Sequence, residues 1–412
     1  MADIRPFAAV RPRKDIASAV AALPYDVYSR KEAKEEVSGK PLSFLCIDRA
    51  ETGLPDEVDT YAPEVYARAR TLFEKMIEDG NFVSDDKPCY YIYELTMDGR
   101  TQSGIVAVSA VDDYLSGTIK KHENTRADKE QDRINHVDTL SAQTGPIFLA
   151  YRAQREIDAI VDRIRAGVPE NDFTSDDGIG HRVWIVDRAE DIERLRDLFA
   201  KTDSIYIADG HHRAASAVKV GVKRRDAHPG YTGEEEFNFF LSVLFPDEQL
   251  AILPYNRVVR DLNGLTPDAF FDAVGKHFTI EKSDAPVAPE KKGTFGLFLD
   301  NCWYKLTAKE EILSDDPVKG LDVSILQDYL LAPVLGIADP RTDSRIDFVG
   351  GIRGLSELEK RATTDMKLAF SMYPTSIEEL FDVADAGLLM PPKSTWFEPK
   401  LRSGLFIHQI ER

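Results

Sequence analysis

Cysteine is scarce in this chain, which has only Cys46, Cys89 and Cys302 among its 412 residues. Three scattered cysteines argue against a disulfide framework and against a thiolate zinc site. No apolar run approaches the roughly 20 residues that span a bilayer. The opening Met-Ala-Asp-Ile-Arg-Pro-Phe also has no apolar signal core. We therefore expect a cytoplasmic protein without a membrane segment.

Positive charge is also in short supply, because the formal net charge is −19. Such a surface repels polyphosphate backbones, and the one basic run, residues 219–225, is short, so we expect no nucleic-acid partner. The sequence has neither a Gly-x-x-x-x-Gly-Lys-Ser/Thr loop nor the protein-kinase signature set, which excludes the ordinary nucleotide-kinase folds. Small anions held by a few arginines remain compatible with an acidic surface.

The length predicts two or three domains, and helix and strand patterns both occur along the chain. We expect three regions with boundaries near 110 and 262, namely 1–110, 111–262 and 263–412. Whether copies of the chain associate is left open. The patterns predict helices at 62–79, 155–166, 189–200, 322–335 and 376–384, strands at 183–186 and 239–244, and hairpins around Asp98-Gly99 and Asp300-Asn301.

Residues 204–221 form the most informative segment. An apolar, β-prone run at 204–208 is broken by Asp209-Gly210, and a helix-compatible stretch then runs to Gly221, where we expect the helix to end. His211, His212 and Arg213 thus fall in the first turn of a helix, whose N-terminus attracts anions. The alternative is that Asp209 caps the helix and the basic residues are solvated. Because the chain has only eight histidines, we favour a phosphate site.

The second segment follows a strand that ends near Ile119. Lys121, His122, Glu123 and Thr125 gather a cation, an imidazole, a carboxylate and a hydroxyl at a strand-to-helix junction, where α/β sheets place ligands. Glu123 is a candidate general base for a hydroxyl nucleophile. The charges of the helix that begins about residue 128 are expected to form a solvated face.

Weaker candidates lie elsewhere in the chain. In the proline-rich tail at 390–400, Lys393 or Ser394 is a candidate phosphate contact, although a clasp formed by the aromatic pair at 396–397 is the favoured interpretation. Arg257 is a similar candidate, and Arg126 or Arg257 could pair with a substrate carboxylate. The Pro-Tyr-Asp turn at 24–26 is expected to be structural.

Four motifs in order resemble a widespread family, the domain-of-unknown-function-1015 family. They are Pro-Tyr-Asp-Val at 24–27, His-Glu-Asn-Thr at 122–125, Ala-Asp-Gly-His-His-Arg at 208–213, and Met-Pro-Pro-Lys-Ser-Thr-Trp-Phe-Glu-Pro-Lys at 390–400. The Asp-Gly-His-His-Arg turn is in addition similar to that of free serine kinases. This second resemblance implies an α+β fold that has a ParB/sulfiredoxin-like core with N-terminal and C-terminal α/β extensions. It also implies transfer of a phosphoryl group to free L-serine.

The resemblance also implies roles for residues. It places the phosphate and transfer site at Asp209, Gly210, His211, His212 and Arg213, with Glu123 as the upstream base. These roles suit phosphoryl transfer, because that reaction needs a positioned nucleophile and neutralisation of the charge on the phosphate oxygens. Arg213 would hold phosphate oxygens, Asp209 would orient a histidine or bind Mg²⁺ through water, and His212 would stabilise the migrating group. The nucleotide-binding set is completed by Lys121, His122 and Thr125, with ATP or ADP as donor.

Other functions were weighed against this one. A sulfiredoxin-like reductase needs a cysteine where His211 stands, which excludes it, and a ParB-like DNA clamp conflicts with the acidic charge. A metal-dependent phosphoester hydrolase that uses His122, Glu123, His211 and His212 stays open, because such sets also bind zinc. A non-catalytic nucleotide-binding protein stays open as well.

Overall fold

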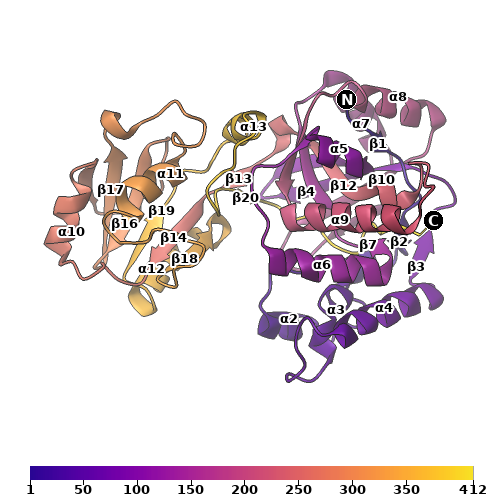
Figure 1. Ribbon diagram of the computed structural model, residues 1–412, viewed down its shortest axis with the longest axis horizontal. Coiled ribbons are helices and arrows are strands. Elements are labelled where there is room, and N and C mark those ends of the chain that lie inside the picture. The colour runs from indigo at the N-terminus through magenta and orange to yellow at the C-terminus, as the bar shows by residue number, and fades with distance from the viewer. Residues whose placement is uncertain (412) are drawn as a thin grey trace. The chain divides into compact units, whose positions relative to one another are not determined.

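The computed structural model describes residues 1–411 and divides the chain into two compact units (Figure 1). The first unit comprises Met1–Leu250 together with the segment from Pro399 onward, and the second comprises Ala251–Glu398. This division differs from the three regions expected from the sequence. The boundary near 110 falls within the first unit, because segments from both sides of it pair in one sheet.

A mixed nine-stranded sheet forms the centre of the first unit. Its strand order is β6-β11-β8-β12-β5-β4-β10-β9, and β1 pairs with β5. The strands are β1 Ile4–Arg5, β4 Tyr90–Met97, β5 Arg100–Ala110, β6 Ile119–Lys120, β8 Ile147–Tyr151, β9 Asn171–Thr174, β10 Gly180–Val186, β11 Ile205–Asp209 and β12 Phe239–Pro246. β6 runs parallel to β11 and β12 parallel to β8, whereas the other pairs are antiparallel. The mixture of helices and sheets confirms the expected α+β class.

The first unit also contains helices, only some of which pack directly on this sheet. They are α1 Ala17–Val20, α2 Arg30–Glu36, α3 Leu45–Asp48, α4 Pro63–Glu78, α5 Val111–Ser116, α6 Ala127–Leu140, α7 Arg155–Arg165, α8 Ala189–Phe199 and α9 His211–Ala227. α9 packs against α6, and α6 against α4, so these three helices lie one beyond the other (Figure 1). The predicted helices at 62–79, 155–166 and 189–200 are confirmed within one residue at each end.

The prediction that the helix after residue 210 ends at Gly221 is wrong, because α9 continues to Ala227. Gly221 lies inside the helix at a close approach: a Cβ there would lie 2.6 Å from the carbonyl oxygen of Phe237. The glycine therefore serves packing between α9 and the segment before β12 rather than termination of the helix.

The expectation of a solvated charged face on α6 is also wrong for several residues. Glu130, Asp132, Arg133 and His136 are all buried. Asp132 accepts hydrogen bonds from the Tyr66 hydroxyl (2.9 Å) and from Arg133 Nε (2.9 Å). These side chains are buried because α6 packs between α4 and α9. The sequence of α6 alone does not show that two other helices cover it.

The C-terminal segment returns to the first unit and pairs with its N-terminal part. β21 (His408–Gln409) pairs with β7 (Ala142–Gln143), and isolated bridges join Val10 to Ile407 and Ala22 to Ser403. β2 (Val10–Pro12) also pairs with β3 (Phe82–Ser84). Residues 407–409 thus belong to the same core as Val10 near the N-terminus.

The second unit is built on a six-stranded antiparallel sheet of order β15-β17-β16-β19-β14-β18. Its strands are β14 Tyr255–Val259, β15 Phe278–Ser283, β16 Thr294–Leu299, β17 Cys302–Ala308, β18 Ile346–Gly350 and β19 Leu368–Ser371, with a separate pair of β13 Ile252–Leu253 and β20 Trp396–Phe397. Its helices are α10 Pro267–Val274, α11 Asp322–Leu326, α12 Gly354–Thr364 and α13 Ile377–Asp385. The single helix predicted at 322–335 is wrong in its extent, because a wider π turn over Gln327–Leu331 follows α11.

Both predicted hairpins are confirmed. Asp98-Gly99 joins β4 to β5 with φ of 52° and 77°, and Asp300-Asn301 joins β16 to β17 with φ of 50° and 60°. Positive φ at both central residues matches the twist of the flanking strands. Within residues 1–411, no helix has the length and apolar character needed to cross a membrane.

The buried His181 makes the stability of the first unit depend on pH. Burial and the neighbouring Arg402 lower the pKa of His181 to about 3, although Asp177 opposes this shift. Its Nδ1 contacts the Tyr93 hydroxyl at 2.9 Å, and its Nε2 contacts Ser175 Oγ at 3.0 Å. The unfolded chain, with a histidine pKa near 6.5, therefore takes up the proton first as pH falls.

We expect the free energy of unfolding to decrease as pH falls from about 6.5 towards 3, with His181 contributing up to roughly 1.4 kcal/mol per pH unit. The measurement is urea unfolding followed by circular dichroism at pH 7, 6 and 5, for the wild type and for His181→Gln. The gap between the two proteins should narrow on acidification. Parallel curves would contradict this account.

Candidate functional site

The strand, turn and helix predicted around Asp209-Gly210 are all present. β11 ends at Asp209, Gly210 has a φ of 93°, and α9 begins at His211. A Cβ at Gly210 would lie 3.1 Å from guanidinium atoms of Arg213, so this position needs glycine for its backbone and for space. No side chain caps the N-terminus of α9. The alternative in which Asp209 caps the helix is therefore not what the structure contains.

Asp209 is held by two cations. Its Oδ2 accepts a hydrogen bond from Lys400 Nζ (3.1 Å) and lies 4.0 Å from Arg213 Nη2, and its Oδ1 accepts the N–H of Gly210 (2.9 Å). Burial opposes ionisation of this carboxyl, but Lys400 and Arg213 outweigh it and hold the pKa of Asp209 well below its usual range. Asp209 is thus an ionised anchor for two cations and a poor proton acceptor.

Arg213 is directed back towards the sheet. Its Nη1 donates to the carbonyl of Pro146 (2.5 Å), the residue just before β8, and only 12% of its side chain is exposed. It also lines a cavity of about 30 Å³, whose other charged or hydroxyl-bearing walls include Tyr25, Asp48, Arg133 and Ser403. Arg133 lies over the Tyr25 ring at 3.9 Å, so the Pro-Tyr-Asp turn packs against this cavity.

The segment after β6 reaches the same place because β6 and β11 are parallel neighbours, with Ile119 opposite Ile205 and Lys120 opposite Tyr206. The carboxyl ends of both strands therefore lie at one edge of the sheet. His122 and Glu123 follow β6 directly, and His211 follows β11 after a short turn. Parallel pairing thus brings together two motifs that are far apart in the sequence.

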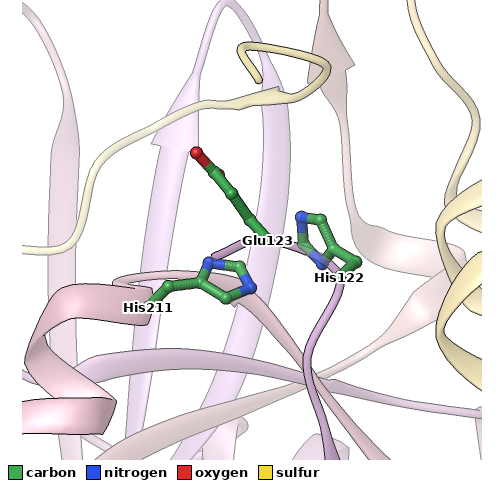
Figure 2. A group of neighbouring side chains, drawn as sticks. All are labelled: His122, Glu123 and His211. Carbon is green, nitrogen blue, oxygen red and sulfur yellow. The ribbon is translucent and has the colours of Figure 1, made fainter. Parts of the chain in front are cut away.

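Figure 2 shows His122, Glu123 and His211 side by side. The two imidazole rings meet edge to face, with centroids 4.5 Å apart and an interplanar angle of 87°. One ligand-type atom from each of the three side chains lies within 4.8 Å of the others. Among the described residues, these three side chains form a group that is compact enough to share a metal ion.

Both histidines of this group are neutral at pH 7. Burial lowers the pKa of His122 to about 4, although the Ile207 carbonyl and Asp209 oppose the shift. Burial, with His122 as neighbour, also holds the pKa of His211 well below its ordinary value. The anion cradle of His211, His212 and Arg213 stays a prediction. Because His211 is neutral, the positive charge at this turn comes from Arg213 and Lys400.

The other predicted residues of the two motifs have different surroundings. His212 Nε2 accepts the backbone N–H of Arg126 (2.9 Å), which ties the start of α6 to α9. Thr125 donates to Glu130 Oε2 (2.8 Å), so its hydroxyl helps to order the first turn of α6. Lys121 is exposed, and its Nζ lies 5.8 Å from the centre of the Tyr114 ring. Arg126 is exposed and pairs with Asp128.

Three weaker candidates belong to the second unit. Arg257 is buried and donates to the backbone carbonyls of Tyr255 and Lys393, the latter at 3.0 Å. Ser394 Oγ donates to the Pro391 carbonyl (2.6 Å). These bonds order the loop at 391–395, and β20 pairs with β13 as a clasp would. A role of Arg257, Lys393 or Ser394 towards a substrate stays a prediction.

Sequence reasoning missed Lys400 as a site residue. Lys400 ends the tail motif at 390–400, and its ammonium reaches Asp209 across 191 positions of sequence. The inclusion of this lysine in the motif was the only available signal. The buried Asp48 and Arg133 were missed too, because neither stands in a pattern that points to the cavity they line.

The chain belongs to the family described as Protein of unknown function (DUF1015), whose sequence profile matches residues 4–324. No curated protein matches it. A solved structure of a mutant free serine kinase in complex with AMP is similar at 12% identity and a TM-score of 0.37, covering 73% of this chain and 92% of that chain. Another mutant, in complex with ADP, has 14% identity and a TM-score of 0.35, covering 74% and 93%. C-terminally truncated SbnI from Staphylococcus aureus has 10% identity and a TM-score of 0.38, covering 72% and 85%.

Proposed function

We propose that this member of the DUF1015 family is a phosphotransferase that moves a phosphoryl group between an adenine nucleotide and a small hydroxyl acceptor, and that the acceptor is free L-serine. The proposal includes a ParB/sulfiredoxin-like core within the first unit. The observation that carries it is the turn between β11 and α9. This turn holds the N-terminus of α9, which has no side-chain cap, together with the cations Arg213 and Lys400. Glu123, in the loop after β6, lies beside it.

Anion binding is the first step of the argument. α9 has 17 residues, so its N-terminus carries a full helix dipole, and no side chain occupies the place of an anion there. Arg213 is anchored by Pro146 and Asp209, which leaves its guanidinium oriented before any ligand arrives. An oriented guanidinium beside a helix N-terminus that has no side-chain cap is suited to bind phosphate oxygens.

Proton transfer is the second step. Asp209 is a poor base because two cations stabilise its charge, whereas Glu123 lies beside two neutral imidazoles. In the proposed reaction, the acceptor oxygen attacks the terminal phosphorus and its proton passes to Glu123. The bond between that phosphorus and the bridging oxygen breaks, and the shortened nucleotide leaves. His212, which orders the Arg126 backbone, is proposed to stabilise the migrating group.

Magnesium fits this site only through water. Mg²⁺ prefers oxygen ligands and usually binds through one or two carboxylates plus substrate phosphates. Both oxygens of Asp209 already accept hydrogen bonds, so Asp209 would meet a nucleotide-bound Mg²⁺ through a water molecule. When bound, the ion would neutralise phosphate charge, and the residues would supply orientation.

The choice of L-serine rests on the resemblance of the Asp-Gly-His-His-Arg turn to that of free serine kinases. A metal-dependent phosphoester hydrolase is the second candidate function. It is favoured by one observation, the compact group of His122, Glu123 and His211. Transfer to an acceptor or to water separates the two functions.

Arg213→Ala should weaken binding of ATP or ADP by about 1.5–3 kcal/mol, the value of a charge-assisted guanidinium–phosphate contact. Isothermal titration calorimetry measures it. Arg224→Ala is the matched control, because Arg224 lies near the other end of α9 and pairs with Asp138. Equal affinities of wild type and Arg213→Ala would remove the phosphate role.

Glu123→Gln should keep the affinity for nucleotide and lower turnover by roughly 10²–10⁴-fold, because the amide cannot accept the proton. Steady-state kinetics with a saturating acceptor gives the comparison. Turnover close to that of the wild type would show that another group accepts the proton.

The central experiment is an acceptor panel. The protein is incubated with Mg²⁺, ATP or ADP, and a set of amino acids and sugars, and products are identified by phosphorus NMR. We expect O-phosphoserine. A different phosphorylated acceptor would keep the reaction class and change the substrate. Release of inorganic phosphate from phosphoesters without transfer would favour the hydrolase, and nucleotide binding without turnover would indicate a binding protein.

A further inference from the structure

Three buried ring nitrogens at the edge of the sheet form no hydrogen bond of normal geometry. They are Nδ1 and Nε2 of His122 and Nε2 of His211. The Ile207 carbonyl lies near the His122 ring and favours its protonated form, but it does not complete such a bond. His122 is 1% exposed and His211 is 7% exposed, so bulk solvent does not reach these nitrogens. Buried polar atoms are nearly always satisfied in folded proteins, and a cluster of exceptions calls for an explanation such as a missing ion.

The cluster has the composition of a metal site. His122, Glu123 and His211 each offer one donor atom, and these atoms lie within 4.8 Å of one another (Figure 2). Two imidazoles and one carboxylate form the ligand set of many zinc and non-haem iron centres, with further positions left for water or substrate.

We infer that His122, Glu123 and His211 bind a divalent transition-metal ion, of the class of Zn²⁺, Mn²⁺, Fe²⁺ or Co²⁺. The ion would satisfy one orphaned nitrogen on each ring. Bonds of about 2.0–2.2 Å in a tetrahedron place ligand atoms roughly 3.3 Å apart, so small side-chain rotations suffice to close the site.

The donor set distinguishes this ion from magnesium. Imidazole nitrogen suits zinc, copper, iron and nickel, whereas Mg²⁺ selects carboxylate, carbonyl and water oxygens. Neutral imidazole is the form of histidine that binds metals, and the ring nitrogens of His122 and His211 that form no normal hydrogen bond are the atoms that would bind the ion. The Asp209 carboxylate is committed to Lys400 and Arg213 and lies outside the ligand group.

This inference goes beyond the proposed function and stands without it, since it concerns only three side chains and an ion. It gives Glu123 a second role, as a ligand. A loss of turnover in Glu123→Gln therefore does not by itself identify a base. The metal content of Glu123→Gln separates the roles. If Glu123 acts only as a base, the variant keeps its metal, whereas the loss of a ligand weakens metal binding.

The test uses untagged, full-length protein that has been treated with a chelator and then titrated with Zn²⁺, Mn²⁺ or Co²⁺ alone. We expect one ion per chain by elemental analysis after dialysis, and a visible Co²⁺ spectrum of low coordination number. His122→Ala and His211→Ala should each lower the affinity for the metal by at least roughly 100-fold. Removing a residue that only hydrogen-bonds a metal ligand already lowers metal affinity by about 10–100-fold. His228→Gln is the matched control, a surface histidine at the other end of α9.

A spectroscopic measurement on the wild type keeps the test decisive if a variant fails to fold. Pulsed electron paramagnetic resonance of bound Mn²⁺ should show coupling to two imidazole nitrogens. Absence of stoichiometric metal, or metal without nitrogen coupling, would overturn the inference. Binding that survives in folded His122→Ala and His211→Ala would overturn it as well.

The outcomes separate this inference from the proposed function. Stoichiometric metal in a protein that transfers no phosphoryl group would keep the metal site and reject the phosphotransferase. Phosphotransfer by a protein that binds no transition metal would reject the metal site and keep the phosphotransferase.

Discussion

The ion pair between Asp209 and Lys400, with Arg213 beside it, is the interaction on which the first unit's candidate site depends. Asp209 ends β11, Arg213 lies in the first turn of α9, and Lys400 comes from the returning C-terminal segment. The negative charge of Asp209 is thus compensated by two positive charges from other parts of the chain, at a single turn. Because the carboxylate is compensated, the two cations stay oriented while the N-terminus of α9 remains without a side-chain cap.

The histidines illustrate how burial changes chemical character. His211 and His212 are consecutive residues at the same helix N-terminus. In the structure, His211 is packed against His122 and is neutral, whereas His212 accepts a backbone N–H from Arg126. The same contrast holds on α6, where Asp132 and Arg133 are buried as a pair. Charge alone therefore does not tell a solvated residue from one that a neighbouring helix covers.

Local patterns were reliable where local chemistry decides the outcome. The Asp98-Gly99 and Asp300-Asn301 hairpins follow from residues that accept positive φ, and α4, α7 and α8 follow from apolar periodicity. Predictions failed where distant packing decides it. Gly221 does not end the helix; it lies inside α9, where the absence of a side chain leaves space for the Phe237 carbonyl. The sheet of the first unit contains strands from both sides of the domain boundary that was expected near residue 110.

The sequence by itself determined the strand, turn and helix around Asp209-Gly210, since glycine and the flanking apolar and helical patterns are local properties. It also identified two motifs as candidates for a functional site, namely His-Glu-Asn-Thr at 122–125 and Asp-Gly-His-His-Arg at 209–213. Only the tertiary structure decided that these motifs meet. The meeting requires β6 and β11 to pair in parallel and the C-terminal segment to return with Lys400. Both are long-range pairings, which depend on how the whole sheet buries its apolar surface and leave no trace in residue spacing.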